Sequence, residues 1–172
     1  MAVLFNPGKL GSLSLKNRFV RSATAECLFN DAGRVTENYL KVYKRLAKGG
    51  VGLIITGNYY VNDVGRHLPR MPVLGNNEII DDLKRVADTV HENDSKIVAQ
   101  INHAGRQSDL RVVDRPIAPS AVLDMASRIK PRAMTEREIE ETILAFGRSA
   151  KAVQEAGFDG VEFHSAHGYL LN

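Results

Sequence analysis

The sequence contains a single cysteine, Cys27, in 172 residues. One cysteine excludes a disulfide within the chain, which fits a reducing compartment such as the cytoplasm. The N-terminus lacks a basic start followed by a long apolar stretch, so no secretory signal is predicted. No apolar run approaches the roughly 20 residues that a membrane helix needs. We therefore expect a cytoplasmic protein with no membrane partner.

A strong excess of charge is also lacking, because the formal net charge is only +3. The basic residues are scattered through the predicted helices, which argues against nucleic acid as the main partner but leaves anionic cofactors open. The motifs Gly-x-Gly-x-x-Gly and Gly-x-x-x-x-Gly-Lys-[Ser/Thr] are both absent, so neither a Rossmann dinucleotide site nor a P-loop is supported. Hydrophobic residues make up 44% of the chain and charged residues 25%, which suits one globular domain.

Strand-like and helix-like segments alternate along the chain. Strands are predicted over residues 18–23, 51–57, 96–102 and 160–164. Helices are predicted from a cap at Thr36 to about Lys48, from Asn76 or Asn77 through Val90, and from a Thr135–Glu138 capping box to Gly157. The apolar face predicted for the third helix includes Ile139, Ile143, Phe146, Ala150 and Val153.

This alternation predicts an α/β fold of parallel βαβ units with right-handed crossovers. The connections that follow the second and third strands are long, residues 58–75 and 103–134, which places function on that side of a barrel or a doubly wound sheet. A (β/α)₈ barrel typically needs about 250 residues. Four strands use up this chain, so we expect a half-barrel, the first four βα units. Residues 4–17, around Gly8 and Gly11, predict a small hairpin that covers the bottom of the sheet.

The tip of the fourth strand carries the densest chemistry: His164, His167 and Tyr169. Two imidazoles can donate N–H groups to one oxygen and stabilise negative charge on it, and a phenol beside them can donate a proton. A metal site is a weaker interpretation, because no third ligand stands at useful spacing. Histidines that merely pack are the remaining alternative.

Polar and small residues mark the other strand tips. Gln100 lies in an apolar strand, where it pairs with neighbouring groups or offers a donor and an acceptor to a heterocycle. Small residues from Ala23 to Ala25, and Gly57 on the next strand, leave room for a flat ligand or make tight turns. Glu162 shares a strand face with His164 and is assigned a structural role.

Two further side chains near the tips are also interpreted as structural. Anion binding is one interpretation of Arg106, and a surface or loop-bracing arginine is the favoured one. We expect Cys27 to be a packed thiol rather than a redox centre.

Five ordered segments together resemble the old yellow enzyme family of FMN-dependent NAD(P)H:flavin oxidoreductases and ene-reductases. The resemblance runs from Leu4 to Asn172. It rests on residues 16–24 (KNRFVRSAT), 49–57 (GGVGLIITG), 100–106 (QINHAGR), 118–120 (APS) and 157–172 (GFDGVEFHSAHGYLLN).

The resemblance implies a (β/α)₈ barrel that holds FMN at the carboxyl ends of its strands. It places Ala23, Thr24 and Ala25 along the flavin with Gly57 close by, and it implies that Gln100 hydrogen-bonds the isoalloxazine ring. His164 and His167 match the histidine pair that grips the carbonyl or nitro oxygen of the substrate, and Tyr169 matches the proton donor. The implied reaction is reduction of FMN by NADH or NADPH, then hydride transfer to an activated alkene such as an enone.

Two departures from the family pattern stand out. Ala25 occupies a position where several members carry a threonine or cysteine that tunes the flavin. The family also continues into four further βα units, which supply a flavin-contacting arginine and the phosphate-binding loops after the seventh and eighth strands. Residues 1–172 are therefore expected to form the N-terminal half of an FMN-binding barrel domain, with weakened FMN affinity.

A half-barrel exposes sheet edges, so we expect self-association or pairing with a missing C-terminal half. The alternative function is a catalytically inactive half-barrel fragment or interaction module that does not retain FMN. A different barrel enzyme, such as an aldolase or isomerase, would need a Schiff-base lysine or a carboxylate base at a strand tip, and the four tips show neither clearly.

Overall fold

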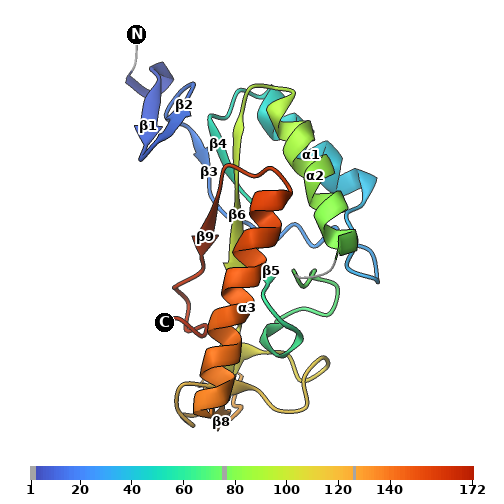
Figure 1. Ribbon diagram of the computed structural model, residues 1–172, viewed down its shortest axis with the longest axis vertical. Coiled ribbons are helices and arrows are strands. Elements are labelled where there is room, and N and C mark those ends of the chain that lie inside the picture. Colours follow the sequence, from blue (N-terminus) through green and yellow to red (C-terminus); the bar gives the residue numbers. More distant parts are fainter. Residues whose placement is uncertain (1–2, 75–76, 126) are drawn as a thin grey trace.

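The computed structural model describes residues 3–74, 77–125 and 127–172. Its sheet consists of parallel strands, with β4 and β6 at its centre, β3 beside β4 and β9 beside β6 (Figure 1). A short further strand, β5, pairs with the last residues of β6 on the side away from β9. The strands are β3 (Val20–Arg21), β4 (Leu53–Ile55), β5 (Tyr59–Tyr60), β6 (Lys96–Asn102) and β9 (Gly160–Phe163).

In the described residues, three helices connect these strands: α1 (Glu37–Lys48), α2 (Asn77–His91) and α3 (Glu136–Glu155). The predicted caps of α1 and α3 are confirmed: the Thr36 side chain accepts from the backbone N–H of Tyr39, and Thr135 forms a reciprocal capping box with Glu138. Of the two predicted starts of α2, Asn76 lies outside the described residues and the helix begins at Asn77. Within the described ranges, no helix is long and apolar enough to cross a membrane.

Several short elements lie outside this βα pattern. The 3₁₀ turns in the part of the chain that the structure describes are η1 (Val3–Phe5), η2 (Asp63–Gly65) and η3 (Gly105–Gln107). Two strands of two residues each, β7 (Ile117–Ala118) and β8 (Arg132–Ala133), pair in parallel within the long connection before α3.

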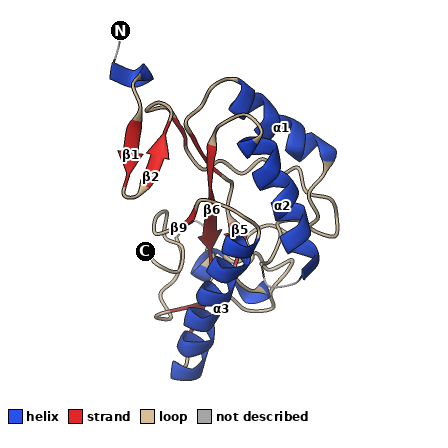
Figure 2. Cartoon of the chain, turned by 45° about the horizontal axis from the view of Figure 1, so that its top comes forward, coloured by secondary structure: helices blue, strands red, loops and turns tan. Residues whose placement is uncertain are grey.

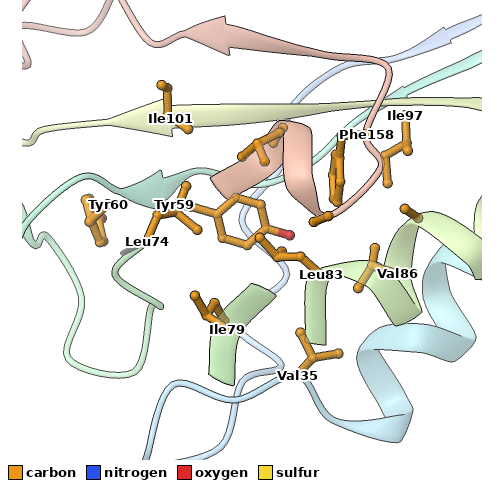
Figure 3. Packing of buried hydrophobic residues seen from close by; sticks show 14 of the residues in the cluster. Val35, Tyr59, Tyr60, Leu74, Ile79, Leu83, Val86, Ile97, Ile101 and Phe158 are labelled. Atoms are coloured by element: carbon orange, nitrogen blue, oxygen red, sulfur yellow. The ribbon is translucent and has the colours of Figure 1, made fainter. Parts of the chain in front are cut away.

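The main core fills the space between the sheet and the helices. Figure 3 shows Ile97 of β6 near Leu83 and Val86 of α2, with Phe158 beside them. All four side chains are buried. Burying an aliphatic or aromatic side chain contributes roughly 1.5–3 kcal/mol, so this layer fixes the strand ends in place.

The other face of the sheet, which lines the inside of a closed barrel, carries a much smaller core. Leu53 of β4 and Val98 of β6 pack there against Leu15. Leu15 belongs to an antiparallel hairpin, β1 (Gly8–Leu10) and β2 (Leu13–Leu15), on the opposite side of the strands from α1 and α2 (Figure 2). The predicted hairpin at the bottom of the sheet is therefore confirmed.

Several details differ from the sequence-based expectations. β3 has two residues rather than six, because the chain leaves the sheet after Arg21, and β4 has three residues rather than seven. On α3 the predicted apolar residues Ile139 and Ile143 are exposed, since the first turns of the helix extend past the sheet. The expectation that Cys27 is packed is wrong: its side chain is exposed, in a segment outside the sheet where its backbone has a positive φ of 53°.

Candidate functional site

The candidate site lies at the carboxyl ends of the parallel strands. β3, β4, β6 and β9 run in one direction, so their C-terminal ends meet at one edge of the sheet. The candidate residues named from the sequence follow these ends by a few positions, except Gln100, which lies two residues before the end of β6. The fold thus brings together groups that are separated by more than 140 positions in the sequence.

His164 directly continues β9, because its backbone N–H donates to the carbonyl of Ile101 at 3.0 Å. Its Nδ1 accepts from the backbone N–H of Ala166 at 3.3 Å, and its Nε2 lies 3.4 Å from Nδ1 of His167. Burial, and the nearby His167, lower the pKa of His164, so its ring is neutral at neutral pH. With Nδ1 accepting, the ring proton is assigned to Nε2, which can donate to His167.

This tautomer leaves the proton of His167 on Nε2 of its exposed ring. One histidine N–H is then available to a ligand, and the other is used between the two rings. A substrate oxygen that accepts from both imidazoles therefore has to displace the contact between them.

Tyr169 completes the cluster. Its ring lies edge-on to His164 at 4.7 Å between centroids and tilted against His67 at 5.8 Å. Burial raises the pKa of its hydroxyl, so the phenol keeps its proton at neutral pH. A neutral, protonated phenol beside a neutral imidazole is the state that a proton donor needs.

The loop after β6 holds this cluster in place. Gln107 donates to the carbonyl of His167 at 2.6 Å, and Arg106 donates to the carbonyl of Gly168 at 3.2 Å. The backbone N–H of Leu170 donates to the carbonyl of His103 at 3.0 Å. His167 adopts a positive φ of 60°, a conformation that costs free energy outside glycine, and these bonds maintain it. The expectation that Arg106 braces a loop is confirmed.

The segment after β3 places Ala23 half-buried and both Thr24 and Ala25 exposed. It packs tightly on Gly57, where an added Cβ would lie 2.5 Å from the carbonyl oxygen of Thr24. Gly57 is therefore required for the close approach of the chain's own backbone. The segment with its small side chains is held against the end of β4.

Gln100 pairs with Glu162 across neighbouring strands. Its Nε2 donates to Oε1 of Glu162 at 2.7 Å, in the register that β6 and β9 share. This contact fixes the orientation of the amide and turns its oxygen away from Glu162, where it can accept from a ligand. The structural role expected for Glu162 fits this contact.

Two polar residues at the strand ends were not singled out from the sequence. Asn102 is fully buried, and neither atom of its amide has a hydrogen-bond partner. Glu26 is buried with one unpartnered oxygen. Strand alternation could have identified Asn102, which follows Gln100 by two positions, whereas no sequence signal marks Glu26 as buried. Among the described residues, no cluster of three or more metal-binding side chains is found.

The sequence matches the model of the NADH:flavin oxidoreductase / NADH oxidase family over residues 3–172. The NADPH dehydrogenase of Bacillus cytotoxicus is 37% identical over 172 residues, which cover 98% of this chain and 49% of that protein. The NADH oxidase of Thermoanaerobacter brockii is also 37% identical, over 98% of this chain and 26% of its own length.

Among solved structures, the Old Yellow Enzyme from Pichia sp. superposes with a TM-score of 0.91 at 30% identity. The match covers 98% of this chain and 47% of that one. The chain thus spans about half the length, or a quarter, of the relatives it matches. Superposition of almost the whole chain on half of such an enzyme confirms the α/β half-barrel expected from the sequence.

Proposed function

Because this chain belongs to the NADH:flavin oxidoreductase / NADH oxidase family, we propose that it forms the FMN- and substrate-binding strand ends of an old yellow enzyme type oxidoreductase. FMN is the cofactor of this family, and NADH or NADPH is its reductant. The proposed substrate is an activated alkene, such as an enone. The observation that carries the proposal is the contact of His164, His167 and Tyr169 at the edge that also holds Gly57 and Gln100.

The strand ends suit a flavin ring, which carries both acceptors and an N–H donor along one edge. Gln100 offers its amide oxygen, and the fully buried Asn102 offers an unpaired donor and acceptor. Ala23, Thr24 and Ala25 leave their side of the site free of bulk. When bound, FMN supplies the hydride chemistry that no side chain of this chain provides.

The substrate's oxygen is proposed to accept hydrogen bonds from His167 and, once the contact between the two rings opens, from His164. Imidazole N–H donors stabilise charge that develops on that oxygen. Tyr169 delivers the proton to the carbon next to the activating group, because its raised pKa keeps the hydroxyl protonated. The half-buried position of Tyr169 limits access of water to this step.

An absorbance spectrum tests the proposal directly. The purified chain is mixed with FMN, excess flavin is removed, and the retained flavin band is measured. Retention supports the proposal and leads to assays of NADH and NADPH oxidation with an enone. Loss of all flavin would contradict it and favour the alternative, a half-barrel that serves only as an interaction module.

The edge strands of the sheet indicate what kind of partner this chain binds. Among the described strands, β3 pairs only with β4, and β9 only with β6. Such edges pair readily with other strands, so we propose that this half-barrel either associates with a second copy or binds the remaining half of a barrel. The single cysteine fits a cytoplasmic location, which stays a proposal.

A further inference from the structure

Glu26, which follows the end of β3, has a buried carboxyl group whose two oxygens lie in different environments. Its side chain is only 6% exposed. Oε1 accepts from the hydroxyl of Tyr43 at 3.1 Å and from Arg21 at 3.2 Å. Oε2 is buried without a hydrogen-bond partner. A buried, unpaired carboxylate oxygen costs free energy, so its persistence at a strand tip requires an explanation.

Three tyrosine hydroxyls behind Glu26 fix which oxygen can serve a ligand. Tyr39 donates to Tyr43 at 3.0 Å, and the hydroxyls of Tyr39 and Tyr59 lie 2.8 Å apart. Each phenol has one proton, so the row must run from Tyr59 through Tyr39 and Tyr43 to Oε1. Arg21 beside Oε1 disfavours a proton there as well. Oε1 therefore acts only as a hydrogen-bond acceptor for Tyr43 and Arg21. Any further hydrogen bond of this carboxyl group has to involve Oε2.

Extending the alternation of β4 by two residues beyond its end at Ile55 indicates that Oε2 lies on the inner side of the sheet. An added Cβ on Gly57 would be 2.7 Å from it. Leu53 and Ile55 of β4 face the inner cluster, whereas Ile54 faces the helices. By the same alternation, the Cβ direction of Gly57 is inward. Glu26 thus reaches from the tyrosine row outside the sheet to the side on which Gln100 lies.

We propose that Oε2 of Glu26 accepts a hydrogen bond from the flavin of this site, which makes Glu26 a further cofactor-contacting residue. The proposal rests on the proposed function. The flavin has two kinds of donor, the ring N–H and the hydroxyls of its ribityl chain, and both suit a buried carboxylate oxygen. Binding would satisfy the one polar atom of Glu26 that the fold leaves unpaired.

The variant Glu26→Gln tests this contact. Its oxygen takes the Oε1 position, because Tyr43 donates a proton there and Arg21 repels an NH₂ group, so a donor replaces the acceptor at Oε2. Flavin affinity is measured by fluorescence quenching with riboflavin, which lacks the phosphate. Affinity is expected to fall at least tenfold, the range for a lost hydrogen bond to a charged group.

Asp82→Asn is the matched control, because Asp82 is a buried carboxylate that pairs with Arg34 away from the strand tips. Its riboflavin affinity should equal that of the unaltered chain. Lumiflavin, which has the ring but no ribityl chain, separates the two donors. If Glu26→Gln loses affinity for both flavins, the donor to Oε2 is the ring N–H. If it loses affinity for riboflavin alone, the donor is a ribityl hydroxyl.

Equal affinity of Glu26→Gln and the unaltered chain for both flavins would overturn the contact while leaving the proposed function intact. Failure of the unaltered chain to bind any flavin would overturn both. If circular dichroism shows that Glu26→Gln does not fold, the contact is tested in the unaltered chain with a carbon-13 label on the glutamate carboxyl groups. The Glu26 resonance, assigned through its backbone, must shift on addition of riboflavin, and an unchanged resonance would overturn the contact.

Discussion

His103 is a buried imidazole that the fold keeps neutral. Its Nδ1 accepts from the backbone N–H of Gly105 at 3.0 Å, and its side chain lies against Gly65, where an added Cβ would be 2.6 Å from the ring. Burial lowers the pKa of His103 to about 4. In the unfolded chain His103 has an ordinary histidine pKa near 6.5. At pH values between these two pKa values, His103 is therefore protonated in the unfolded chain but neutral in the folded chain.

The free energy of unfolding should therefore fall as pH drops from about 6.5 toward 4. From pH 7 to pH 5 the contribution of His103 to this loss is about 2 kcal/mol. The variant His103→Asn keeps an acceptor for Gly105 but cannot titrate. Between pH 7 and pH 5 its free energy of unfolding should therefore decrease less than that of the unaltered chain, by the contribution of His103. Urea unfolding at both pH values measures the difference. Equal losses in both proteins would show that His103 titrates normally when folded.

Tyr169 offers a second prediction at this scale. Tyr169→Phe removes the hydroxyl but keeps the ring against His164, so folding and flavin affinity should be unchanged. Under the proposed function, enone reduction should slow about 100-fold or more, while reduction of the flavin by NADPH keeps its rate. Stopped-flow absorbance separates the two half-reactions. An unchanged rate of enone reduction would remove Tyr169 from the proton-donor role.

Residues close in sequence were the easiest to place from the sequence. His164, His167 and Tyr169 lie within six positions, so a single turn brings them together. Gln100 and Glu162 could each be assigned to a strand face, but their pairing depends on the register of β6 with β9. The burial of Glu26 could not be predicted, because it depends on tyrosines of α1 and on the segment after β4.

At the scale of elements, α3 begins at a capping box that was predicted from sequence. Thr135→Ala removes the side chain that accepts from the backbone N–H of Glu138. This change should lower the free energy of unfolding by about 1 kcal/mol. Thr135→Ser keeps the hydroxyl and should unfold near the same denaturant concentration as the unaltered chain. If Ala and Ser behave alike in urea, the cap contributes nothing to stability.

Element types were predicted more accurately than element ends. β6 has its predicted bounds, because it is central and pairs along both sides. β3 is shorter than predicted because the chain leaves the sheet after Arg21, and Glu26 then accepts a hydrogen bond from Tyr43 of α1. The apolar start of α3 looked like a core face in the sequence, but periodicity shows only which residues share a face. Whether another element covers that face is a property of the fold.

For the whole molecule, open edges and exposed apolar side chains predict association. Ile143 is 64% exposed and Leu144 60% exposed on α3, and Phe163 of the edge strand β9 is also exposed. Light scattering after size-exclusion chromatography should show a dimer or larger species whose share rises with protein concentration. The inner core is small, so a partner that covers it should also raise the denaturation temperature as concentration increases.

The double variant Ile143→Glu with Leu144→Glu should shift this equilibrium toward monomer, because it places charge on the exposed apolar patch. Gln154→Glu, on the same helix, adds a charge without removing an apolar group and should leave association unchanged. A chain that stays monomeric at every concentration tested would contradict the prediction.

The bracing between the loop after β6 and the loop after β9 has a consequence for protein engineering. Arg106 and Gln107 hold the backbone of Gly168 and His167 across 60 or more positions of sequence. An added Cβ on Gly105 would lie 3.0 Å from the backbone of Leu170. The two loops thus form one module, and transplanting the histidine-tyrosine loop into another barrel requires its partner loop as well. In a library that varies only one of these loops, most variants would lose the hydrogen bonds that hold the two loops together.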